Sequence, residues 1–330
     1  MTNWSFADIW NKSLEAGKPD RPLAPRDHLW ASELGKAPVD LYLKLKGEKP
    51  TNPPNRRAKR KFEAGNMMEW VVGSVLKRAG IFISTQEWMS HQYDELLKVT
   101  GNMDFKAGGK PNYEKAKRVL EFYDLPPFFA RATEAIVEHF KEAYPSGLSE
   151  DYIEVKSCSG FMFDIYEKQG ASKAHQMQLF HYLKSTNSPK GRLIYISKDD
   201  LRMLEFIVLN PSPVEDEYKN AIARITGYIR ADEQPPIEPL IAFDPETCRF
   251  SKNWLVEYSD FLTKLYKFKK PSDYDAAVKG DVAKFNRTVN RLLAGKNVTA
   301  NNQGVLDQIK AEYPEAYKKL ESQTKKEVAK

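Results

Sequence analysis

The sequence is poor in cysteine, and this shortage narrows the protein classes. Only Cys158 and Cys248 occur among 330 residues. A disulfide framework and a CxxC zinc or redox pair are therefore both excluded. We expect the protein to work in a reducing compartment such as the cytoplasm.

Long apolar runs are absent as well. No stretch of about 18 apolar residues occurs, and the first eight residues lack a basic segment followed by an apolar one. We therefore expect neither a secretory signal peptide nor a membrane-spanning helix, and no membrane partner.

Several common catalytic motifs are missing. The sequence contains no GxxxxGK[ST] phosphate loop, no GxGxxG, no HExxH and no GxSxG. Nucleotide hydrolysis, zinc proteolysis and serine esterase chemistry lose their usual support.

What is present is a globular composition with one basic segment. Hydrophobic residues make up 41% of the chain and charged residues 29%, which leaves ample material for a core. The net charge is +6, and residues 44–61 hold eight basic residues against the single acidic Glu48. The positive charge is thus local, as a polyanionic partner requires. The densest run consists of Arg56, Arg57, Lys59, Arg60 and Lys61. In most proteins such a run is a solvated face, and in a protein that acts on DNA we predict that it binds phosphates.

Hydrophobic periodicity predicts an α/β fold with a mixed central sheet flanked by helices. Expected strands cover residues 81–93, 96–105, 151–157, 192–197 and 202–209. Expected helices cover residues 27–45, 56–79, 113–144 with a break at two prolines, 172–184, 215–230, 254–268, 274–293 and 305–319. We divide the chain into an N-terminal helical region (1–55), a core (56–235) with a helical insertion (113–144), and a C-terminal helical region (236–330).

Acidic and basic residues stand near the ends of two predicted strands. Asp104 closes one strand, and Glu154 and Lys156 lie two apart in the next, so alternation puts them on one face. Two carboxylates that meet at one point can bind a hard cation such as Mg²⁺, and a nearby ammonium can orient a water for attack on a phosphodiester. There are simpler alternatives. Asp104 could cap a turn, and Glu154 and Lys156 could be solvated strand residues.

Two further groups lie on predicted helices. Gln178 and Tyr182 share a helix face, with His175 one turn earlier, and Glu69 precedes the first predicted hairpin. Each of these residues alone is typical of an ordinary helix surface. A second Glu-x-Lys triplet at Glu217 falls in a helix with solvated neighbours, and we interpret it as coincidence.

The order of these motifs resembles the RecB-like branch of the PD-(D/E)XK nuclease superfamily, which includes recombination exonucleases, CRISPR-adaptation nucleases and phage nucleases. The resemblance spans about residues 29–209. The motifs that carry it are Gly65-x-x-x-Glu69, Gly101-x-x-Asp104, Glu154-x-Lys156 and Gln178-x-x-x-Tyr182.

The resemblance implies a restriction-endonuclease-like core with helical additions at both ends. Asp104, Glu154 and the Val155 carbonyl would then hold Mg²⁺, with Mn²⁺ as an alternative and Glu69 as a further ligand. Lys156 would orient the nucleophilic water. Gln178 and Tyr182 would contact the DNA backbone. His175, one turn earlier, is a further candidate for a DNA contact, with an ordinary helix-surface histidine as the alternative.

Some relatives carry an iron–sulfur cluster, but this chain has no cysteine at the corresponding places. Ala37, Val256 and Ser259 stand there instead, so we expect no cluster. The insertion between Asp104 and Glu154 is longer than the usual connection in these relatives. The resemblance therefore does not define how the substrate is held.

The combined interpretation is a Mg²⁺-dependent deoxyribonuclease, by resemblance an exonuclease that acts on DNA ends or single strands. It would serve recombination or repair in a bacterium or a phage-infected host cytoplasm, with an annealing protein or a helicase as partner. The alternatives are a structure-specific endonuclease, an RNA-directed nuclease, and a catalytically inactive DNA-binding scaffold that binds through the basic run alone.

Overall fold

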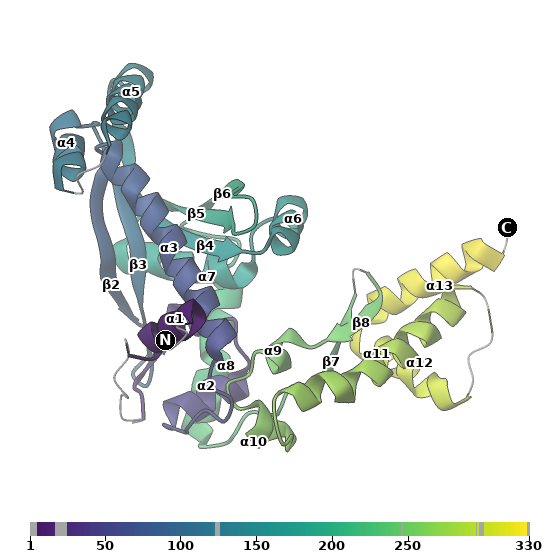
Figure 1. Cartoon of the computed structure of the whole chain (residues 1–330). Helices are drawn as coiled ribbons and strands as arrows, with labels where there is room; N and C mark the ends of the chain where they lie inside the picture. Colours follow the sequence, from purple (N-terminus) through teal and green to yellow (C-terminus); the bar gives the residue numbers. More distant parts are fainter. Residues whose placement is uncertain are drawn as a thin grey trace. The chain divides into compact units, whose positions relative to one another are not determined.

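The computed structural model describes residues 5–16, 25–122, 126–245, 247–294, 296 and 300–328 (Figure 1). The chain divides into two compact units. The first comprises residues 1–35, 41–48 and 54–233, and the second comprises residues 36–40, 49–53 and 234–330. The last two residues of the charged tail, Ala329 and Lys330, lie outside the described residues.

The first unit is built on a six-stranded mixed sheet with the order β1-β3-β4-β5-β6, in which β2 also pairs with β3. The pairs β1–β3 and β4–β5 are parallel, and the pairs β2–β3, β3–β4 and β5–β6 are antiparallel. The strands are β1 (His28–Trp30), β2 (Phe82–Gln92), β3 (Lys98–Gly109), β4 (Leu148–Cys158), β5 (Lys190–Ser197) and β6 (Met203–Leu209).

Two helices cover the sheet. Helix α3 (Arg56–Arg78) begins at Asn55, whose side chain accepts the backbone N–H of Ala58, and packs Val72 against Ile153 and Val155. Helix α7 (Lys173–Thr186) is buried continuously from Met177 to Leu183. Ile153 and Val155 of β4 pack on α3, whereas Glu154 between them bonds Gln178 of α7. Because successive side chains of a strand point to opposite faces, α3 and α7 lie on opposite sides of β4. The predicted α/β class with a mixed, helix-flanked sheet is confirmed.

The remaining helices of this unit surround that core. The predicted insertion forms two helices, α4 and α5, which pack on each other and contact α3 at one end of the sheet (Figure 1). The bounds are α1 (Phe6–Ala16), α4 (Tyr113–Phe122), α5 (Pro127–Ala143), α6 (Gly160–Gln169) and α8 (Glu215–Ala231).

The second unit is mainly helical, with a small hairpin. Its core is formed by aromatic and aliphatic residues that include Phe243, Phe250, Val289 and Leu320. The elements are β7 (Ile241–Asp244), β8 (Arg249–Lys252), α9 (Trp254–Glu257), α10 (Leu262–Tyr266), α11 (Ser272–Leu293), α12 (Ala300–Glu312) and α13 (Pro314–Val328). Within the described part of the chain, no helix combines the length and the apolar character needed to cross a bilayer.

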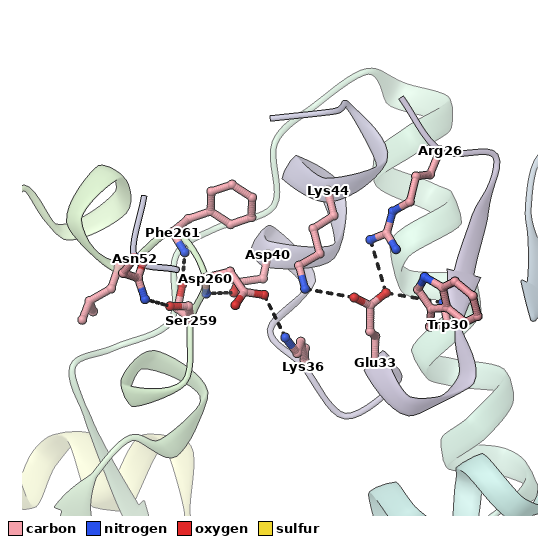
Figure 2. Close-up of polar contacts among 11 residues, drawn as sticks. Arg26, Trp30, Glu33, Lys36, Asp40, Lys44, Asn52, Ser259, Asp260 and Phe261 are labelled. Atoms are coloured by element: carbon pink, nitrogen blue, oxygen red, sulfur yellow. Dashed lines mark hydrogen bonds and ion pairs between the residues drawn. The ribbon is translucent and has the colours of Figure 1, made fainter. Parts of the chain in front are cut away.

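The structure differs from the sequence prediction in several segments. The helix expected over residues 305–319 is divided into α12 and α13, because Pro314 begins a new helix. The helix expected over residues 27–45 is instead strand β1, a short 3-10 helix (Ala31–Glu33) and α2 (Pro38–Leu45). Glu33 accounts for the difference, because its carboxylate accepts bonds from Arg26, Lys44 and the Trp30 backbone N–H and so holds a turn (Figure 2). The hairpin β7–β8 and helix α6 were not predicted, and the helix expected over 254–268 is divided into α9 and α10.

Candidate active site

The site begins where β3 and β4 separate. The two strands pair from Gly109 as far as Phe105 opposite Ile153, and no β3–β4 pair follows along β4. At this point Oδ2 of Asp104 accepts the backbone N–H of Val155 at 2.8 Å. The carboxylate thus replaces a lost ladder bond, and the separation leaves room for a second acidic group beside it.

That second group is Glu154, which is 2% exposed. Its Oε1 accepts bonds from Lys156 Nζ at 2.5 Å and Gln178 Nε2 at 2.7 Å. Its Oε2 is buried, and none of the described residues gives it a hydrogen bond. A buried carboxylate oxygen without a partner is unfavourable unless something else supplies positive charge.

Helix α7 supports this carboxylate through a chain of hydrogen bonds. Gln178 Nε2 donates to the Tyr182 hydroxyl at 3.0 Å, and that hydroxyl donates to the Asn102 carbonyl at 3.1 Å. Tyr182 is only 1% exposed. In this structure Tyr182 therefore fixes Gln178 against β3, and its contact with DNA stays a prediction.

Gly101 is required for this arrangement. A Cβ atom at position 101 would lie 2.7 Å from the Tyr182 hydroxyl oxygen and 2.8 Å from Cε1 of the same ring. The glycine of the Gly-x-x-Asp motif therefore makes room for the tyrosine of the Gln-x-x-x-Tyr motif, which explains why the two occur together.

We expect Gly101→Ala to lower the free energy of unfolding by about 1–3 kcal/mol, because the buried ring has nowhere to move. The matched control is Gly227→Ala on helix α8, where a Cβ meets nothing within 4 Å and the stability should rise by up to about 1 kcal/mol. Urea unfolding measures both. Equal midpoints for the two variants would contradict the packing argument.

Three carboxyl groups influence one another here. Burial raises the pKa of Glu154 to about 8, with added contributions from the charges of Asp104 and Glu69 and an opposing effect of Lys156. Burial and the charge of Asp104 raise the pKa of Glu69 to about 7. Burial also raises the pKa of Asp104. Burial lowers the pKa of Lys156, but the surrounding carboxylates outweigh it, so the net shift is upward and Lys156 stays protonated.

These residues suit a hard divalent cation. The donors are carboxylate oxygens, as Mg²⁺ prefers, and one of them, Glu154 Oε2, has no other partner. Among the described residues, no three His, Cys, Asp or Glu side chains converge as a complete metal cage. Mg²⁺ commonly uses only one or two protein carboxylates and fills its other positions with waters and substrate phosphates. The Asp104–Glu154 pair is consistent with that pattern.

The predicted DNA-binding run occupies the first turns of α3. Arg56 pairs with Glu15 at 3.2 Å, and Arg60 donates to Asn11 at 3.2 Å, so helix α1 engages these two. The run continues beyond them to Lys61. Burial lowers the pKa of Lys198, and the nearby charge of Lys61 lowers it further. The exposed Lys61 and the half-buried Lys198 thus repel each other, as cations that gather without an anion do. Binding of DNA by this run stays a prediction.

His175 lies near the site and contacts a residue of strand β5. Its Nδ1 is 2.8 Å from the Tyr195 hydroxyl, and burial, aided by Lys156, lowers its pKa to about 3. The ring is therefore neutral at pH 7 and can contact DNA only as a hydrogen-bonding group. That contact stays a prediction.

Gln86 is a residue beside the site that the sequence did not indicate. It stands in β2 between the residues paired with Phe105 and Met103, with a positive φ of 52°, and its side chain lies close enough to Asp104 to oppose the rise in the pKa of that carboxyl. A left-handed conformation is unfavourable for a glutamine and is typical of functional sites. No glycine or asparagine stands at this position in the sequence, so only the structure reveals the left-handed conformation.

The three positions at which cluster-containing relatives carry cysteine are buried in the second unit. Ala37 and Val256 are buried, and the Ser259 hydroxyl donates to Asp40 Oδ1 at 2.7 Å (Figure 2). Asp40 Oδ2 accepts the backbone N–H of Asp260 at 2.8 Å. Burial raises the pKa of Asp40 despite these bonds.

Comparison with known proteins gives distant structural likenesses. No family model and no curated protein matches the chain. The crystal structure of SSO0001 is similar with a TM-score of 0.42 and 14% identity, over 74% of this chain and 94% of that one. An alkaline exonuclease, LHK-Exo, from Laribacter hongkongensis has a TM-score of 0.36 and 12% identity, over 68% of this chain and 95% of that one. Its complex with dAMP has a TM-score of 0.35 and 13% identity, over 62% and 90%. At such scores the reaction must be argued from the site itself.

Proposed function

We propose that this chain is a divalent-metal-dependent deoxyribonuclease. The observation that carries the proposal is Glu154: a buried carboxylate with one unpartnered oxygen, beside Asp104 and next to a protonated lysine. Such a group is unfavourable for folding, and a cation bound there would offset that cost. A scaffold protein has no need of it.

Asp104 and Glu154 would hold the cation together with the Val155 carbonyl, and Glu69 would be a further ligand through a bridging water. A cation there would neutralise charge on the phosphate in the transition state. Lys156, fixed by Glu154, would orient the attacking water. Gln178 would keep Glu154 in position through its 2.7 Å bond. The water's oxygen forms a bond to phosphorus, the P–O3′ bond breaks, and the products are a 5′-phosphate and a 3′-hydroxyl.

Exonuclease action, and a role in recombination or repair beside an annealing protein or helicase, are the finer parts of this proposal. They rest on the motif resemblance. A DNA end, rather than an internal site, would then be the substrate.

The test uses end-labelled linear DNA and covalently closed circular DNA, each with Mg²⁺ or with EDTA. We expect Mg²⁺-dependent loss of the linear DNA only, and at least a 100-fold slower loss with Lys156→Met, which removes the ammonium but keeps most of the alkyl stem. Loss of both DNAs would indicate an endonuclease. Retained binding without any cleavage would contradict the nuclease proposal and favour the scaffold.

A further inference from the structure

A cavity of about 240 Å³ adjoins the candidate active site. Glu69 of α3 forms part of its wall, as does Gln86, the left-handed residue of β2 whose side chain lies close to Asp104. Pockets for drug-sized ligands occupy roughly 300–1,000 Å³. This cavity therefore suits a smaller molecule, or one small part of a larger one.

The apolar walls of the cavity favour a flat ring. Trp70, one residue after Glu69, lines it and is 63% exposed, which is unusual for so large an apolar side chain. Phe105 lies deeper, and Gly73 makes room for it, because a Cβ at position 73 would lie 2.8 Å from the Phe105 ring. Val119 of the inserted helix α4 completes the apolar lining.

The polar groups of the cavity suit the edge of a base. The side chains of Asn66 and Gln86 line it, and each carboxamide carries both a donor and an acceptor. Carboxamides are the side chains that pair bidentately with adenine edges. The left-handed backbone at Gln86 places its carboxamide beside both the cavity and Asp104.

We propose that this cavity binds one unpaired nucleobase of the DNA strand being cut, stacked on Trp70, so that the neighbouring phosphate reaches Asp104 and Glu154. This inference deepens the proposed nuclease function and rests on it. A base inside a duplex is stacked on both faces and cannot enter such a cavity without being extruded. The preferred substrate is therefore a single-stranded or frayed DNA end, and the insertion that carries Val119 contributes to the choice.

The test measures binding without cleavage. Twelve-nucleotide single-stranded DNAs carry a fluorescent label and one abasic sugar, moved one position at a time, and their affinities are measured by anisotropy in EDTA. For the wild type we expect one position at which loss of the base weakens binding about tenfold. Trp70→Ala should bind the intact strand about tenfold more weakly and show no such position. Trp70→Phe should keep it.

Trp254→Ala is the matched control, because Trp254 is 54% exposed and belongs to the second unit. It should keep the wild-type abasic profile. A profile that is flat in the wild type, or the same in Trp70→Ala as in the wild type, would overturn the inference. Tighter binding of the matching RNA would overturn its assignment to DNA.

The two proposals fail separately. Cleavage of linear DNA by the wild type, together with an unchanged abasic profile in Trp70→Ala, would support the nuclease proposal and contradict the base-pocket proposal. An abasic position that depends on Trp70, without any Mg²⁺-dependent cleavage, would support the base-pocket proposal and contradict the nuclease proposal.

Discussion

Asp104→Asn should reduce DNA cleavage at least about 1000-fold while leaving the fold intact. The asparagine keeps an oxygen that can accept the Val155 N–H, which Asp104 Oδ2 accepts at 2.8 Å. What it removes is one of the two negative charges that would hold the cation. The effect on cleavage is therefore electrostatic and separate from packing.

The same variant should unfold at an equal or higher temperature than the wild type. Asp104 is 7% exposed, and burial raises its pKa, so its ionised form is unfavourable in the folded protein. Its charge also raises the pKa values of Glu69 and Glu154. Neutralising position 104 relieves this repulsion, as in sites where function opposes stability.

The measurement pairs single-turnover cleavage in Mg²⁺ with thermal unfolding in EDTA. Asp216→Asn, an exposed carboxylate on α8, is the matched control and should change neither quantity. An Asp104→Asn variant that cleaves within tenfold of the wild-type rate would place the metal elsewhere.

The parts of this site that the sequence predicted are those set by local periodicity. Glu154 and Lys156 share a face because a strand repeats every two residues, and Gln178 and Tyr182 share one because a helix repeats every 3.6. The structure brings all four together, and it adds Asp104 from the neighbouring strand and Glu69 from α3. Their catalytic roles remain proposals.

The parts that the sequence did not predict depend on contacts between distant segments. Strand β1 has three residues, too few for a pattern that the sequence could reveal, and it pairs with Lys98–Thr100 of β3, a stretch that β4 does not reach. The left-handed residue Gln86 lies between residues that pair with β3 on both sides, so the pairing holds its conformation. Tertiary pairing of this kind overrides local propensity.

Removing divalent metal should make stability fall as the pH rises. The folded-state pKa of Glu154 is about 8, against an ordinary value of 4.5. In that pH window the folded protein holds a proton that the unfolded chain has released, so stability from this group is full below about pH 4.5 and decreases up to about pH 8. The upper limit of the loss is about 5 kcal/mol, from 1.36 kcal/mol per unit of pKa difference. Glu69, with a pKa of about 7, acts in the same direction.

Mg²⁺ should reverse this trend, because a cation binds the ionised carboxylates and displaces their protons. We expect saturating Mg²⁺ to raise the unfolding temperature more at pH 8 than at pH 6, and the Mg²⁺ concentration for half-maximal cleavage to decrease over the same range. Thermal unfolding at pH 6, 7 and 8, with EDTA or with Mg²⁺, measures the first effect, and cleavage titrations measure the second. Asp104→Asn should lose most of the Mg²⁺ effect, and Asp216→Asn should retain it. A Mg²⁺ effect that is the same at all three pH values would show that the buried carboxylates are not the groups that bind the cation.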